Sequence, residues 1–153
     1  MTTLYRSYSY LLLAIFLTLT SCSTTQGPDQ PAEPQAQTAD AWLQLAETAK
    51  PPQQAQYRLN AAALLYQQGD STAAENALSG IAPKYLQGKD VADYIALRAR
   101  LQSLRQGPDA ALAWIQSERP RTALNALQPQ ERIAAYEALA DLHHAAGNDL
   151  QAA

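Results

Sequence analysis

The sequence contains few residues whose types and spacing could perform chemistry. Cys22 is the only cysteine among 153 residues, and it stands at the end of a short apolar run. A single cysteine excludes an internal disulfide and metal clusters of the CxxC type. His143 and His144 are the only histidines. Because neighbours on a helix diverge by about 100°, we expect this pair at a solvated helix end rather than around one metal ion.

The other polar residues form no catalytic pattern. The sequence has no GxSxG, HExxH or phosphate-loop motif. Charged residues are scattered, and we interpret five of them as solvated helix faces: Arg98, Arg100, Arg105, Glu131 and Arg132. Asp141 stands three residues before His144 and is a candidate surface partner for it. We therefore predict that the protein is not an enzyme and has no catalytic residue, metal or cofactor.

An apolar segment leads up to Cys22. Residues 10–20 are almost entirely apolar, and Arg6 is the only charged side chain before them. A run of about 11 residues is too short to span a bilayer, which requires about 20. A basic start, a short apolar run and small residues together predict a secretory signal peptide over residues 1–21.

The residues Leu19, Thr20, Ser21 and Cys22 resemble the lipobox of bacterial lipoproteins. The resemblance implies that the Cys22 thiol is acylated with diacylglycerol and that the signal peptide is cleaved just before it. Two or three acyl chains hold a protein firmly to a membrane. Because Ser23 rather than Asp follows the cysteine, lipoprotein sorting in Gram-negative bacteria implies the periplasmic face of the outer membrane. The alternative is an ordinary signal peptide with a cysteine by chance.

Residues 22–38 contain the lipidated cysteine of this interpretation and a polar stretch with three prolines and no large apolar residue. Such a composition cannot bury a core. It predicts a disordered tether between the membrane and the rest of the chain.

The composition of the chain predicts an all-α fold. There are 31 Ala, 22 Leu and 17 Gln, but only one Val and one Phe, so helix formers abound and strand formers are scarce. Apolar spacing predicts helices over residues 39–50, 52–68, 71–78, 90–106, 110–117 and 129–146, with residues 80–88 as a connector. We expect Ser71 to cap the third helix. Trp42 and Trp114 fall within the apolar patterns, which favours the core over a binding platform.

Three turn glycines, Gly69, Gly107 and Gly147, recur at spacings of 38 and 40 residues. The first and third share an A-x6-G-[DN]-x3-A pattern, whereas Arg100 replaces the small residue in the middle unit. This pattern resembles the tetratricopeptide repeat (TPR), whose period is 34. We therefore expect antiparallel helical hairpins in an irregular TPR-like solenoid over residues 39–153; the alternative is a generic bundle of α-hairpins.

The third unit stops shortly after its turn, so we expect the TPR-like domain to be incomplete at its C-terminus. Solenoids need a polar capping element. Four apolar positions would then lack a covering helix: Ile133, Tyr136, Leu139 and Ala140. The rival interpretation is that this segment folds back onto residues 110–127 and buries itself.

The order of lipobox, tether and irregular hairpins resembles the N-terminal region of the LpoA family, the outer-membrane lipoprotein activators of class A penicillin-binding proteins. The helical residues that carry the resemblance are 41–46, 58–65, 69–70, 73–74, 99–101, 107–112, 138–142 and Gly147. The family continues into a large domain similar to periplasmic binding proteins. The resemblance implies that this chain is the anchoring and spacing half.

The function implied by the resemblance is regulation of peptidoglycan synthesis, in which the lipoprotein binds and activates a class A penicillin-binding protein. An alternative is a scaffold lipoprotein for the assembly of outer-membrane proteins or pili, which also uses TPR hairpins. A net charge of −3 provides no basic footprint for nucleic acid.

Overall fold

The computed structural model describes residues 38–148 of the chain. Every described helix belongs to one compact unit. Within the described range there are seven α-helices, two short 3-10 turns and no strand. The all-α prediction is therefore confirmed for this part of the chain. The predicted signal peptide, the lipobox with Cys22 and all of the tether except Thr38 lie outside the described residues.

The first three helices are α2 (Ala39–Thr48), α3 (Pro51–Gln67) and α4 (Ser71–Ser79). The hydroxyl of Thr38 accepts a hydrogen bond from the Ala41 N–H and caps α2. Two prolines at the start of α3 fit there because the first helical N–H groups have no internal partner. The prediction that Ser71 caps the third helix is wrong. The Asp70 carboxylate takes that role, accepting from the Ala73 N–H at 2.9 Å.

The second half of the described chain contains four helices and two 3-10 turns. These elements are η1 (Pro83–Tyr85), α5 (Lys89–Gln106), α6 (Pro108–Ile115), α7 (Glu118–Asn125), η2 (Pro129–Arg132) and α8 (Ile133–Ala145). The predicted helices leave residues 118–128 unassigned, so α7 was not predicted. Its Pro120 lies in the first turn, where proline is tolerated. The helix predicted from Pro129 begins as a 3-10 turn and becomes α-helical only at Ile133.

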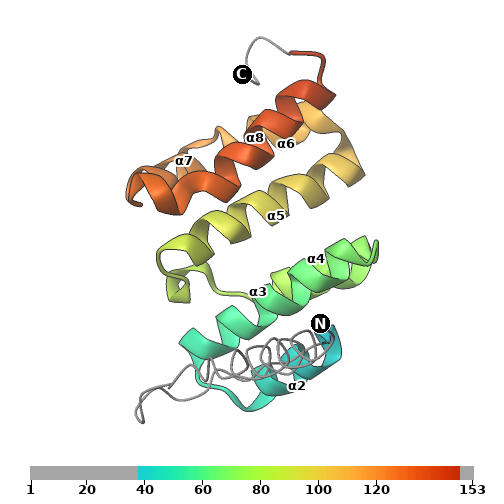
Figure 1. Cartoon of the computed structure of the whole chain (residues 1–153), viewed down its shortest axis with the longest axis vertical. Coiled ribbons are helices and arrows are strands. Elements are labelled where there is room, and N and C mark those ends of the chain that lie inside the picture. Colours follow the sequence, from blue (N-terminus) through green and yellow to red (C-terminus); the bar gives the residue numbers. More distant parts are fainter. Residues whose placement is uncertain (1–37, 149–153) are drawn as a thin grey trace, which may run out of the picture. The chain divides into compact units, whose positions relative to one another are not determined.

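The helices pack as antiparallel pairs. Helix α3 packs against α2 and α4, α5 pairs with α6, and α8 lies on both α5 and α6. Figure 1 shows that α3, α5 and α8 run in the same direction, whereas α4 and α6 run in the opposite direction. Alanines with no exposed surface occupy facing helices, such as Ala62 on α3 and Ala74 on α4. Their small side chains let the backbones approach closely, so the helix pairs share one continuous apolar core.

Two of the three turn glycines adopt the same geometry. At Gly69 the next N–H, that of Asp70, donates to the Leu65 carbonyl at 2.9 Å; after Gly147 the Asn148 N–H donates to the His143 carbonyl at 2.8 Å. Both glycines have positive φ, 83° and 76°, as a Schellman helix end requires. Gly107 differs, because Pro108 begins α6 immediately after it. The repeat pattern seen in the first and third units therefore corresponds to a shared turn.

One face of α8 is buried and another is exposed. Ala135, Ala138 and Leu142 are buried, whereas Ile133 is 55% exposed and Tyr136 is 51% exposed. Leu139 and Ala140 are half-buried. The expectation of an uncovered apolar face is thus confirmed at Ile133 and Tyr136. The rival interpretation, in which this segment folds back onto residues 110–127, also holds in part. The opposite face of α8 packs on α6, and on α5 as well.

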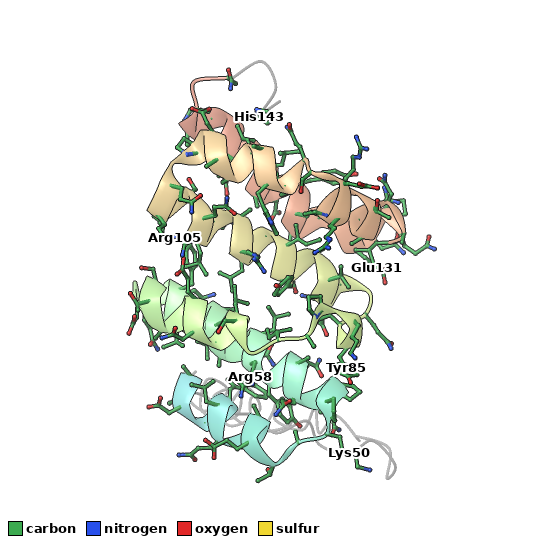
Figure 2. All side chains as sticks on the ribbon, turned by 180° about the vertical axis from the view of Figure 1, so that it is seen from behind. Lys50, Arg58, Tyr85, Arg105, Glu131 and His143 are labelled. Carbon is green, nitrogen blue, oxygen red and sulfur yellow. The ribbon has the colours of Figure 1, made fainter. Side chains whose placement is uncertain are left out.

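Three expectations about side chains need correction. His143, labelled in Figure 2, is buried rather than solvated. Its Nδ1 has no hydrogen-bond partner. Its neighbour His144 is exposed, as expected of a helix end. Trp42 and Trp114 are half-buried at the edge of the core rather than inside it. The Trp42 ring lies 5.3 Å from the ring of Tyr57, so it joins α2 to α3.

Candidate functional site

The Arg98 guanidinium lies on α5, on the side of that helix that faces α6. The Arg98 guanidinium carbon lies 5.3 Å from the centre of the Trp114 ring, in cation–π geometry. The same guanidinium donates a hydrogen bond of 2.7 Å to the hydroxyl of Tyr94, one turn earlier on α5. Tyr94 is itself buried. Two aromatic side chains from two helices therefore fix the position of one arginine head group.

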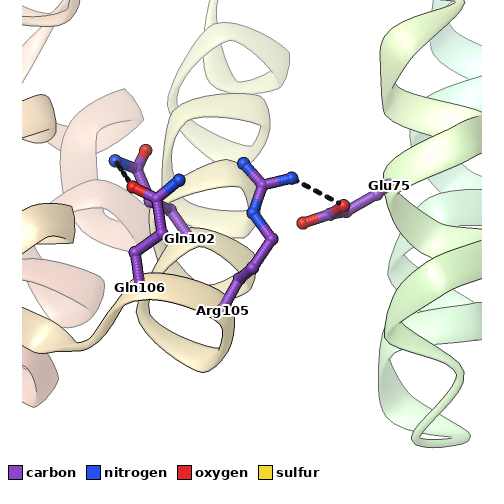
Figure 3. A network of polar contacts seen from close by, with 4 residues as sticks. All are labelled: Glu75, Gln102, Arg105 and Gln106. Atoms are coloured by element: carbon purple, nitrogen blue, oxygen red, sulfur yellow. Dashed lines mark hydrogen bonds and ion pairs between the residues drawn. The ribbon is translucent and has the colours of Figure 1, made fainter.

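A second arginine bridges α5 and α4. The Arg105 guanidinium donates to the Glu75 carboxylate at 3.2 Å, across the space between the two helices (Figures 2 and 3). Figure 3 also shows Gln102, one turn before Gln106, with the two amides joined by a hydrogen bond of 3.4 Å. Gln102 further donates to the Ala110 carbonyl at the start of α6. These polar side chains line one side of α5 at helical spacing.

The two arginines line a cleft between α4 and α5, which we call the α4–α5 cleft. Its volume is about 210 Å³, and its lining residues are Glu75, Leu78, Ser79, Arg98, Leu101, Gln102 and Arg105. With two guanidinium groups and one carboxylate, the ionisable lining carries an excess of one positive charge. The cleft is chemically suited to anionic groups, because a planar guanidinium can donate two parallel hydrogen bonds to a carboxylate.

A second groove lies between α3 and α5. Its volume is about 240 Å³, and it is lined by Leu59, Asn60, Ala63, Tyr66, Gln67, Asp93, Ala96, Leu97, Arg100 and Ala134. Its charges are already engaged in pairs. Asp93 accepts from Lys89, and this hydrogen bond raises the pKa of Lys89 above its ordinary value. Arg100 pairs with Asp141 on α8 at 3.0 Å.

Of the charged residues interpreted from the sequence as solvated helix faces, Arg98 and Arg105 are exposed as expected, whereas Arg100, Glu131 and Arg132 are half-buried. All five also contact other groups of the protein. Arg132 donates to the carbonyls of Asn125 and Leu127, at and just after the C-terminal end of α7. Carbonyls at a helix end have no partner within the helix. Glu131 accepts from the Gln128 N–H and closes the η2 turn. Arg100 and Arg105 form ion pairs between helices, and Arg98 packs on Trp114. One signal in the sequence was missed. Tyr94 and Arg98 are four residues apart, a spacing that places both side chains on one face of a helix and allows them to interact.

The described residues contain no cluster of three or more His, Cys, Asp or Glu side chains that could hold a metal ion. Within the same range no helix has both the length and the apolar character needed to cross a membrane. The predicted lipidation site, Cys22, is not among the described residues.

By fold, the described part of the chain is an all-helical protein of stacked antiparallel helix pairs with clefts between them. Comparison with known proteins found no match to a family model, a curated protein or a solved structure.

Proposed function

We propose that this chain is a non-catalytic lipoprotein of the outer membrane that binds and activates a class A penicillin-binding protein. In this proposal Cys22 carries the lipid anchor, residues 22–38 act as a tether, and residues 39–153 form a TPR-like solenoid that faces the periplasm. The helical domain supplies a binding surface and performs no reaction. The whole assignment follows the resemblance to the LpoA family.

The observation that carries the proposal is the order of its parts: Leu19-Thr20-Ser21-Cys22, a proline-rich stretch, and then stacked helix pairs. Stacked helix pairs are a common architecture for binding other proteins, because neighbouring units form extended surfaces. The parallel course of α3, α5 and α8 and the matching turns at Gly69 and Gly147 support a repeat of TPR type.

The mechanism of the proposed activation is a shift between two conformations of the synthase. A bound regulator can shift such an equilibrium only by the difference in its affinities for the two states. The helical domain would therefore have to bind the active synthase more tightly than the resting one. A tenfold difference in affinity corresponds to about 1.4 kcal/mol.

The second candidate function is a scaffold lipoprotein for the assembly of outer-membrane proteins or pili. The same stack of helix pairs favours it equally, because it requires only a binding surface. The two functions differ in the partner, and a direct binding experiment separates them.

The test is capture of detergent-solubilised membrane proteins by the full lipidated chain, followed by glycan-polymerisation assays with the captured synthase. The proposal expects a class A penicillin-binding protein in the eluate and faster polymerisation when the chain is added. Capture of assembly factors of outer-membrane proteins or pili, with no synthase, would favour the scaffold. The Cys22→Ala chain serves as a control that separates binding from membrane attachment.

A further inference from the structure

Arg98 is held in place without a carboxylate partner. Its neighbours Arg100 and Arg105 on α5 pair with Asp141 and Glu75, but among the described residues no carboxylate lies within ion-pair distance of Arg98. One of its five N–H donors is used by the Tyr94 hydroxyl. The remaining donors are available to a ligand.

Arg98 is exposed to solvent, and its guanidinium contacts two aromatic side chains. Stacking on Trp114 and the hydrogen bond to Tyr94 limit the rotamers that this long side chain adopts. Less conformational entropy is then lost when a ligand binds. A weakly hydrated guanidinium also gives up water more readily than a lysine ammonium.

The surroundings of Arg98 fit a carboxylate. The α4–α5 cleft has room for several water-sized groups beside it, and Gln102 and Arg105 follow along the same helix face at four and seven residues. Arg105 is engaged with Glu75, yet this pair is solvent-exposed, with 61% and 36% of the two side chains accessible. Exposed ion pairs are weak, so an incoming carboxylate can displace Glu75.

We propose that the α4–α5 cleft binds acidic side chains of a partner protein, with Arg98 as the anchoring residue and Arg105 as a second contact. The inference rests on the proposed function, since it names the surface and the chemistry by which the helical domain recognises its partner. Glu75 then acts as an internal competitor, occupying Arg105 until an acidic segment arrives.

The experiment uses the full chain and a synthetic ten-residue peptide, acetylated and amidated, with three glutamates among serine and glycine. Binding is read from the fluorescence of Trp114 in a Trp42→Phe background, because Arg98 stacks on Trp114. Because Arg98 is exposed and exposed ion pairs are weak, Arg98→Gln should weaken binding roughly two- to fivefold. Binding should also weaken as salt is raised.

The variant Glu75→Gln gives the sharpest expectation. This change removes the carboxylate that competes with the peptide for Arg105. The peptide should therefore bind the Glu75→Gln chain more tightly than the unmodified chain. A merely structural role for the Arg105–Glu75 pair predicts no such gain. Arg121→Gln is the matched control, because it makes the same change at an exposed position on α7, outside the cleft. Arg98→Lys retains the charge but not the planar fork, and should bind with intermediate affinity.

The inference is overturned if the acidic peptide binds equally to the unmodified and Arg98→Gln chains while both remain helical by circular dichroism. It is also overturned if the glutamine version of the peptide binds as well, or if inorganic phosphate binds as tightly as the peptide. Capture of the synthase separates the two proposals. If the unmodified chain and Arg98→Gln capture the synthase equally, the proposed function stands and the cleft assignment fails. If neither captures it but the peptide binds through Arg98, the proposed function fails and the cleft assignment stands.

Discussion

The Arg100 guanidinium nitrogen Nη2 lies 3.0 Å from the Asp141 carboxylate, and this pair joins α5 to a helix 41 residues further along the chain. In the repeat pattern Arg100 occupies the place that Ala62 holds in the first unit. At this position of α5 a small residue is not needed, because Arg100 faces the Asp141 carboxylate on α8 rather than a closely packed helix backbone. The irregularity of the sequence repeat thus has a structural cause.

We expect this ion pair to contribute little to stability. The side chains of Arg100 and Asp141 are 31% and 67% exposed, and exposed pairs typically contribute 0.2–1 kcal/mol. A double-mutant cycle with Arg100→Gln and Asp141→Asn, measured by urea unfolding, should give a coupling free energy of about 0.5 kcal/mol that falls in 1 M salt. A coupling unaffected by salt would contradict an electrostatic origin.

Gly88 should tolerate alanine less well than Gly69 does. It occupies the second position of a turn closed by the Asp90 N–H and the Gln87 carbonyl, with φ +50° and ψ −131°. That combination is typical of a type II′ turn, which favours glycine. An added Cβ would also lie 2.8 Å from a carboxylate oxygen of Glu131. We expect Gly88→Ala to lower the free energy of unfolding by about 2–3 kcal/mol.

Gly69→Ala is the matched control for this prediction. Gly69 also has positive φ, but a Cβ there would meet no atom within 4 Å. The backbone conformation alone should cost about 1–2 kcal/mol. Thermal unfolding of both variants, followed by circular dichroism, tests the order. Equal losses would mean that Glu131 moves aside without cost.

Replacing His143 should not destabilise the protein. The side chain is only 7% exposed, and its Nδ1 has no hydrogen-bond partner. An unsatisfied buried polar atom costs about 1–3 kcal/mol. His143→Leu removes that atom at similar volume, so the free energy of unfolding should stay equal or rise by up to about 1 kcal/mol. A clear loss in urea unfolding would reveal a polar interaction of the imidazole.

The exposed face of α8 should tolerate polar residues. Ile133 and Tyr136 are more than half exposed, and surface substitutions usually change stability by less than about 0.5 kcal/mol. We expect Ile133→Ser and Tyr136→Ser each to leave the melting temperature nearly unchanged. The control on the buried face of the same helix is Leu142→Ala, which should cost about 2–5 kcal/mol. A similar loss for the serine variants would show that another element covers them in solution.

Cys22 should be the point of membrane attachment. The expectation rests on Leu19-Thr20-Ser21-Cys22 at the end of the apolar run. Cys22→Ala should abolish the incorporation of labelled palmitate and leave an uncleaved precursor, visible as a larger band. Ser23→Thr is a suitable control, because it lies beside the cysteine without altering the thiol. Palmitate labelling of the alanine variant at the normal level would refute the assignment.

The local sequence determined the helical class and most helix boundaries. Alanine, leucine and glutamine favour helices whatever their surroundings, and the breaks at Gly69, Gly107 and Pro83 act within a few residues. The sequence missed features where two local arrangements have similar free energy. Asp70 rather than Ser71 caps α4, and Pro120 lies in the first turn of α7.

The tertiary structure decided which side chains meet. Nothing near Arg98 in the sequence indicates that Trp114, sixteen positions later, lies beneath it, and nothing near His143 indicates that it is buried. Such contacts depend on the rotation of each helix about its axis and on the partner it packs against. In an alanine-rich chain many faces are similarly apolar, so periodicity alone does not fix that rotation. Close packing of small residues across the helix pairs fixes it, and the α4–α5 cleft follows from that packing.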